Sequence, residues 1–228
     1  MLCYYTMHGI ELIEPLWWMN ILNRWLDIQN KYEWLVNLAP TFADVFVIAY
    51  PIFLVALYVY AILKKKNSIK QGCLYIFLAT FIAVLINIWI QCFFYKERPI
   101  VVLNQVEVEE TLLHEILPTS SFPSDHAVVS MAFAMATLLR WIYNKRKIFT
   151  WSGLLFIIIS LVMTACRILT LVHWPSDIVA GLWLWILVPL LLMIRPIRYA
   201  LIRNIINPII RFEQWIIETL FNYKQPEV

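Results

Sequence analysis

Long apolar runs separated by short polar segments make up most of the chain. Five of these runs approach or exceed the roughly 20 residues that a helix needs to cross a bilayer. They cover residues 42–63, 73–94, 127–143, 150–172 and 178–194. The third and fifth runs are short, so we expect both helices to extend into their flanks. The pattern predicts an all-α, polytopic integral membrane protein with about five to six transmembrane helices.

Two flanking segments have apolar residues at helical spacing but also carry charges. Within residues 1–41, the stretch "PLWWMNILNRWLDIQNKYEWLV" mixes apolar positions with Asn, Arg, Asp and Lys. We expect this N-terminal segment to be an interfacial or re-entrant helix, with a sixth span as the alternative. Residues 195–228 alternate basic and apolar positions, which predicts an amphipathic tail on the cytoplasmic membrane surface.

Composition and charge exclude other classes of protein. The chain is 62% hydrophobic and 14% charged, whereas soluble domains are near half apolar and a quarter charged. The net charge of +3 is too small to indicate a nucleic-acid partner. The cysteines at positions 3, 73, 92 and 166 have neither paired nor metal-ligand spacing, so we expect unpaired apolar side chains.

Basic residues are distributed unequally among the loops. They gather in "KKKNSIK" after the first run, in "NKRK" after the third, and in the C-terminal tail. By the positive-inside rule, these segments lie in the cytoplasm. The segment 96–126, with its acidic "VEVEE", and the loop around "HWPSD" then lie together on the outer side of the membrane.

Two arginines stand at outer helix ends. Arg98 precedes Pro99, and a residue before proline is driven out of helical conformation, so Arg98 should lie where the second span ends. Taken alone, Arg98 could equally be an interfacial side chain that extends to water. Arg167 lies near the outer end of the fourth run, where an ionisable residue is costly and indicates function. Guanidiniums bind phosphate oxygens well, through paired hydrogen bonds.

The stretch "SSFPSDHA" predicts the start of the third span. We expect Ser120 or Ser121 to cap this helix and Pro123 to occupy its first position. The first turn would then contain Ser124, Asp125 and His126. The free N–H groups of such a turn form either an anion site or a plain helix cap, and a cap has no need of an imidazole.

The stretch "CRILTLVHWPSD" places His173 four residues before Asp177, across the start of the fifth span. A hydrogen bond from Nδ1–H of the histidine to the carboxylate would fix the tautomer and leave Nε2 available. Two arginines, two histidines, an aspartate and a helix start on one membrane face point to phosphoryl transfer.

These clusters resemble the motifs of the type 2 phosphatidic acid phosphatase (PAP2) superfamily. The motifs of that superfamily are Lys-x6-Arg-Pro, Pro-Ser-Gly-His and Ser-Arg-x5-His-x3-Asp. Here they read Gln91-x6-Arg98-Pro99, Pro123-Ser124-Asp125-His126 and Cys166-Arg167-x5-His173-x3-Asp177. The resemblance covers residues 42–194, which it identifies as a transmembrane catalytic domain.

The resemblance implies a role for each residue that matches a motif. His173 is the nucleophile that forms a phosphohistidine, Asp177 orients it, and His126 protonates the leaving oxygen. The phosphate-binding set is Arg98, Arg167, Ser124, Asp125 and Gln91. The chemistry requires neither a metal nor another cofactor, and the expected partners are a lipid phosphate and the surrounding membrane lipids.

Three positions depart from the superfamily pattern. Gln91 replaces the motif lysine, Asp125 replaces glycine, and Cys166 replaces serine. Gln91 can donate a hydrogen bond but supplies no charge. The Asp125 variant, "SFPSDHA", resembles the bacterial undecaprenyl-diphosphate phosphatases associated with bacitracin resistance. That subgroup implies an enzyme at the outer face of the bacterial plasma membrane, which recycles the lipid carrier for peptidoglycan synthesis.

Two alternative functions remain open at this point. One is a phosphatase for another lipid phosphate, namely phosphatidylglycerophosphate, phosphatidate or lipid A. The other is a non-catalytic lipid-binding scaffold, suggested by Gln91 in place of the motif lysine. A transporter is disfavoured, because the charged residues gather at one membrane face and not at the bilayer midplane.

Overall fold

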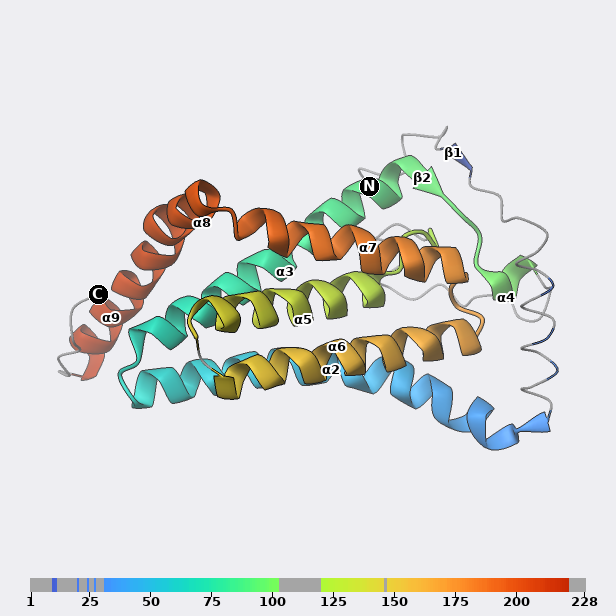
Figure 1. Ribbon diagram of the computed structural model, residues 1–228, viewed down its shortest axis with the longest axis horizontal. Helices are drawn as coiled ribbons and strands as arrows, with labels where there is room; N and C mark the ends of the chain where they lie inside the picture. Colours follow the sequence, from blue (N-terminus) through green and yellow to red (C-terminus); the bar gives the residue numbers. More distant parts are fainter. Residues whose placement is uncertain are drawn as a thin grey trace.

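The computed structural model describes residues 31–102, 120–145 and 147–221, together with residues 10–11 and positions 20, 24 and 27. Within these ranges, five helices are long and apolar enough to cross a membrane (Figure 1). They are α2 (Glu33–Leu63), α3 (Asn67–Phe93), α5 (Asp125–Tyr143), α6 (Lys147–Leu169) and α7 (Pro175–Leu192). Each coincides with one of the predicted runs, which confirms a helical, multi-pass membrane protein.

Helix α5 forms the centre of the bundle. In its spanning window 61% of the residues are buried inside the protein, compared with 17–39% for the other four helices. It packs against α3, α6 and α7. Its sequence explains this position, because the alanines at 127, 132, 134 and 136 are completely buried. Small side chains let helices approach closely, and close packing is a main source of helix association in membranes.

Glycines on α6 and α7 permit close contacts with α5. A Cβ atom at Gly153 of α6 would lie only 2.6 Å from the Cα of Leu138 on α5. A Cβ atom at Gly181 of α7 would lie 2.8 Å from the side chain of Ala127. Favourable carbon contacts are roughly 3.5–4.0 Å long, so a larger residue at either position would push the helices apart. The contact at Gly181 brings the first half of α7 against the first turn of α5.

The outward faces of the surrounding helices are apolar. Helices α2, α3, α6 and α7 expose large hydrophobic side chains, for example Ile52, Trp89, Ile158 and Trp183. Continuous exposed apolar surface of this kind is typical of protein that faces lipid.

All five spanning helices begin before their apolar runs, and the difference is largest for α2 and α3. Helix α2 begins at Glu33, so it takes in the end of the segment expected to be interfacial. Helix α3 begins at Asn67, inside the basic loop, because Lys70 is buried there against Glu213 at 2.9 Å. Most of residues 1–32 lie outside the described residues, so an interfacial or re-entrant N-terminal segment stays a prediction.

The C-terminal tail is helical over residues 195–221. It consists of α8 (Arg195–Leu201), a π-helical turn η1 (Ile202–Ile206) and α9 (Asn207–Phe221). Leu201, Ile206 and Ile210 pack on Tyr75 of α3. Figure 1 shows this tail at the end of the bundle remote from the start of α7. Its predicted place on a membrane surface stays a prediction.

Two small features depart from the expectations. A two-residue parallel pair joins β1 (Ile10–Glu11) to β2 (Phe94–Tyr95), directly after α3. Cys92 is disulfide-bonded, so the prediction of four unpaired cysteines is wrong for this one. Cys73 and Cys166 are free and buried, as expected.

Candidate active site

Three polar segments converge at one end of the bundle. They are the segment between α3 and the short helix α4 (Pro99–Val102), the start of α5, and the turn between α6 and α7 (Figure 1). Backbone hydrogen bonds join them. Ser121 donates its N–H to the carbonyl of Lys96 at 2.8 Å, and Ile100 donates to the carbonyl of Leu171 at 3.0 Å. The clusters predicted on the outer side therefore meet at the same end.

Helix α5 starts at Asp125, with Ser124 as its N-cap. Ser124 has an extended backbone, and its hydroxyl makes no capping hydrogen bond. The residue is completely buried, and its Oγ has no hydrogen-bond partner among the described residues. A buried hydroxyl without a partner is costly, whereas the free N–H groups of a helix start attract anions. Both features are typical of a site that binds an anion through its oxygens.

The prediction that Ser120 or Ser121 caps this helix, with Pro123 at its first position, is wrong. The hydroxyls of these two serines donate hydrogen bonds to other segments. The Ser120 hydroxyl donates to the carbonyl of Phe94 at 2.9 Å. The Ser121 hydroxyl donates to the carboxylate of Asp177 through a short hydrogen bond. The two serines thus tie the loop before α5 to its neighbours, and the helix begins later.

His126 and Arg167 are in contact between α5 and α6. Nη2 of Arg167 lies 2.9 Å from Nδ1 of His126 and also contacts Nε2. Because a guanidinium can only donate, the ring nitrogen to which it bonds is an acceptor. Arg98 and His173 also lie within electrostatic range of His126. The two histidines and two arginines selected from the sequence thus gather around one place.

His173 is buried in the turn between α6 and α7, and only 4% of its surface is exposed. Its Nδ1 lies 3.0 Å from the carbonyl oxygen of Ser121. A carbonyl can only accept, so Nδ1 carries a hydrogen, and in a neutral ring the lone pair is on Nε2. The hydrogen bond expected from Nδ1 to Asp177 is not formed. Nδ1 lies 3.8 Å from that carboxylate, which is beyond hydrogen-bond distance. The carbonyl of Ser121, and not Asp177, is thus the hydrogen-bond partner of Nδ1.

The carboxylate of Asp177 is completely buried and links three segments. It accepts hydrogen bonds from Nζ of Lys96 at 2.6 Å, from the Ser121 hydroxyl, and from the backbone N–H of Trp174 at 2.9 Å. A buried carboxylate is stable only when it is paired and hydrogen-bonded in this way. Asp177 therefore contributes to the site by holding its loops together as well as by its closeness to His173.

Lys96 was not among the residues selected from the sequence. It is 4% exposed, and its Nζ donates to Asp177 and to the hydroxyl of Ser176, both at 2.6 Å. A signal was present in "YKERP", where a lysine lies two residues before Arg98 at a span end. Its spacing does not match the superfamily lysine, which is why the motif did not select it.

Arg98 lies between α3 and α4 and has a non-helical backbone, as its position before Pro99 predicts. Its side chain is half-buried. Burial lowers the pKa of its guanidinium, while the carboxylates of Asp125 and Asp177 oppose that change. Its proximity to both carboxylates places this guanidinium between the start of α5 and the start of α7.

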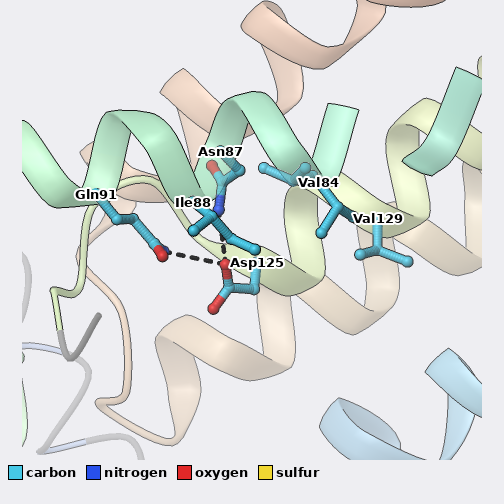
Figure 2. Close-up of a pocket in the computed structure, with 7 residues that line it drawn as sticks. Val84, Asn87, Ile88, Gln91, Asp125 and Val129 are labelled. Carbon is cyan, nitrogen blue, oxygen red and sulfur yellow. Dashed lines mark hydrogen bonds between the residues drawn. The ribbon is translucent and has the colours of Figure 1, made fainter. Parts of the chain in front are cut away.

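Gln91 and Asn87 hold Asp125 from the neighbouring helix α3 (Figure 2). Nε2 of Gln91 donates to Oδ1 of Asp125 and to the carbonyl of Pro123, both at 3.0 Å. Nδ2 of Asn87 donates to the same Oδ1 at 2.6 Å. The Gln91 amide thus directs its hydrogens to the protein, whereas the sequence suggested a phosphate. The helix–helix hydrogen bond that is usual for a membrane asparagine is present at Asn87.

A cavity of about 200 Å³ lies between α3 and α5 beside this polar group. Apart from Asn87, Gln91 and Asp125, its lining is apolar and consists of Val84, Ile88, Val128 and Val129. Figure 2 shows Val84 and Val129 extending to one side of the Asp125 carboxylate. The cavity thus has an apolar wall and a polar end, and Asp125 at the polar end precedes His126 in the chain.

Comparisons with known proteins identify the family of the chain. A curated protein of Escherichia coli (strain K12) named "Putative undecaprenyl-diphosphatase YbjG" is 27% identical over 153 residues, which cover 67% of this chain and 69% of that protein. No solved structure matches the chain significantly. Residues 72–198, more than half of the chain and including all three clusters, match the PAP2 superfamily. The chain belongs to the PAP2 superfamily.

Proposed function

We propose that the protein is an undecaprenyl-diphosphate phosphatase that works through a phosphohistidine intermediate. The observation that carries this proposal is the hydrogen bond from Nδ1 of His173 to the Ser121 carbonyl, which leaves the lone pair on Nε2. A second imidazole, His126, lies within electrostatic range of His173 and of the guanidiniums of Arg98 and Arg167. A nucleophile, a second proton-transfer group and fixed positive charges are the parts that phosphoryl transfer requires.

In the first step, Nε2 of His173 attacks the terminal phosphorus of the diphosphate. A phosphorus–nitrogen bond forms, and the bond from that phosphorus to the bridging oxygen breaks. His126 in its protonated form gives its proton to the leaving oxygen, and undecaprenyl phosphate is released. A phosphoryl group bound to Arg167 draws the guanidinium away from His126, so that the imidazole can hold this proton.

In the second step, His126 takes a proton from a water molecule whose oxygen attacks the phosphohistidine. The phosphorus–nitrogen bond breaks, inorganic phosphate leaves, and His173 is restored. Arg98, Arg167, the free hydroxyl of Ser124 and the N–H groups at the start of α5 stabilise the charge of the transition state. The chain's own groups neutralise the phosphate in this route, so it requires no metal ion.

The lipid character of the substrate is supported by two observations. The site lies at the end of helices that are apolar enough to span a membrane. The cavity between α3 and α5 offers an apolar wall beside Asp125, which precedes His126 in the chain, and a hydrocarbon chain attached to a phosphate requires such a wall. The name of the E. coli relative points to undecaprenyl diphosphate among such lipids.

The site is assigned to the outer face of a bacterial plasma membrane. Lys64, Lys65, Lys66 and the tail arginines lie at the opposite end of the bundle, which the positive-inside rule assigns to the cytoplasm. Cys92, near the site end of α3, is disulfide-bonded, and disulfides persist in oxidising compartments outside the cytoplasm. Product released there is the carrier that cell-wall synthesis reuses.

The substrate assignment predicts a preference among lipids. Purified protein in detergent should hydrolyse undecaprenyl diphosphate with a higher kcat/KM than phosphatidylglycerophosphate, phosphatidate or lipid A, as measured by phosphate release. His173→Ala should lower kcat by about 10⁴-fold or more, because the nucleophile is lost. A preference for another lipid would contradict the substrate. A folded wild-type protein that turns over none of them would favour a lipid-binding scaffold.

The hydrogen bonds of Asp125 predict that its carboxylate supports structure more than chemistry. Asp125→Gly leaves Asn87 and Gln91 without their acceptor, which should lower the thermal unfolding temperature by about 5 °C. The backbone N–H groups at the start of α5 remain, so kcat should stay within about tenfold of wild type. Thermal unfolding and phosphate release measure the two effects. Complete loss of turnover in a folded variant would show that the carboxylate takes part directly.

The pairing of Lys96 with Asp177 predicts a positioning role for Lys96. Lys96→Met leaves the buried Asp177 carboxylate without its cation and removes the contact that joins this loop to the start of α7, so kcat/KM should fall by about tenfold or more. Lys96→Arg keeps the charge and should restore most of the lost activity. Phosphate release measures the activity of both variants, and thermal unfolding checks that they are folded. A wild-type kcat/KM in folded Lys96→Met would contradict this positioning role.

A further inference from the structure

The end of the bundle opposite the active site contains a buried arginine without a carboxylate partner. Arg140 lies in the last turn of α5 and is only 3% exposed. Its Nε is buried and makes no hydrogen bond to any described residue. No described carboxylate forms an ion pair with it. Burying a guanidinium in this way is costly unless something neutralises it.

The other buried cations of the described residues behave differently. Lys70 has Glu213 at 2.9 Å, and Lys96 has Asp177 at 2.6 Å. Each of these lysines is thus neutralised by a carboxylate of the chain itself. Arg140 is the exception among the described residues, although it is as deeply buried as they are.

The surroundings of Arg140 add positive charge instead of removing it. Its guanidinium lies 5.8 Å from the centre of the Tyr75 ring on α3, a weakly favourable cation–π contact. Arg198 of α8 lies close enough to repel it electrostatically. Arg198 stacks on the Tyr143 ring at 3.9 Å and donates to the carbonyl of Met193 at 3.0 Å. Both contacts hold the Arg198 side chain in place near Arg140, and neither of them neutralises the charge of Arg198.

We propose that Arg140 and Arg198 form a binding site for the phosphate of an anionic phospholipid headgroup. Two guanidiniums held by aromatic rings present hydrogen-bond donors in the planar arrangement that phosphate oxygens accept. The anion supplies the charge that the described carboxylates do not. Basic pockets between helices on the cytoplasmic side of membrane proteins bind lipid headgroups in this manner.

A phospholipid fits this position better than free phosphate does. Large apolar side chains next to the two arginines in sequence are exposed, namely Ile142, Tyr143, Ile194 and Ile197. Acyl chains can cover such a surface, whereas inorganic phosphate cannot. The site joins α5 to α8, so a bound headgroup would fasten the C-terminal tail to the centre of the bundle. This inference does not depend on the proposed phosphatase activity.

Titration of purified protein with a short-chain phosphatidylglycerol, followed by native mass spectrometry, tests the proposal. This lipid is a phosphodiester and has no terminal phosphate for the active site to remove. Wild-type protein should bind it at least tenfold more tightly than the zwitterionic phosphatidylcholine of the same chain length. Arg140→Met should reduce the phosphatidylglycerol affinity by about tenfold to a hundredfold, as expected for lost charged hydrogen bonds.

Two matched controls separate this site from other basic residues. Arg203→Met removes an exposed arginine of the same tail, and Arg98→Met removes a guanidinium of the active site. Both should keep the wild-type preference for phosphatidylglycerol. Arg198→Met, at a half-buried position, should weaken phosphatidylglycerol binding as Arg140→Met does. If Arg140→Met does not fold, Arg198→Met provides the test in its place.

The proposal also predicts an effect on stability in zwitterionic detergent. Because the Arg140 charge is unneutralised there, Arg140→Met should unfold at a temperature equal to or above that of the wild type. Added phosphatidylglycerol should raise the unfolding temperature of the wild type alone. Equal binding of the two lipids, an unchanged affinity in both variants, or equal stabilisation by inorganic phosphate would overturn the proposal.

Discussion

The buried carboxylate of Asp177 is the interaction on which the active-site end depends. It joins Lys96, the loop before α5 through Ser121, and the start of α7 through the backbone of Trp174. Removing one partner of a buried ion pair costs about 3–5 kcal/mol, because the remaining charge is left alone. One group can therefore determine how three loops meet. His173 takes its position from the same arrangement, since its Nδ1 is held by the carbonyl of Ser121.

The central helix α5 connects two ends of opposite chemistry. Its start offers the N–H groups of a helix N-terminus and the unpartnered Ser124 hydroxyl, and its last turn carries Arg140. The helix dipole favours anions at the N-terminal end of the helix and cations at its C-terminal end. Between them, small side chains and the glycines of α6 and α7 allow the packing that fixes both ends. The positions of the active site and of the arginine pair thus follow from one tightly packed helix.

Apolar periodicity predicted the five spans, because a bilayer demands about 20 apolar residues per helix and leaves few alternatives. Motif order and loop charge predicted that His126, Arg167 and His173 lie at one end. Lys96 was missed because its role depends on a tertiary ion pair that no local spacing encodes. The cap at Ser124 was missed because Ser120 and Ser121 bind other segments. Gln91 could not be interpreted without seeing that Asp125 accepts its hydrogen bond.

We propose that Nε2 of His173 forms a covalent bond to phosphorus. Rapid quenching of the wild-type enzyme with undecaprenyl diphosphate labelled in its terminal phosphate measures this directly, followed by peptide mapping under alkaline conditions that preserve phosphohistidine. We expect label on the peptide that contains His173 within a single turnover. We also expect that label to accumulate in His126→Ala, which lacks the base that activates water for the second step. Phosphate release by wild type without label at His173, or with label at another residue, would contradict a phosphohistidine at this position.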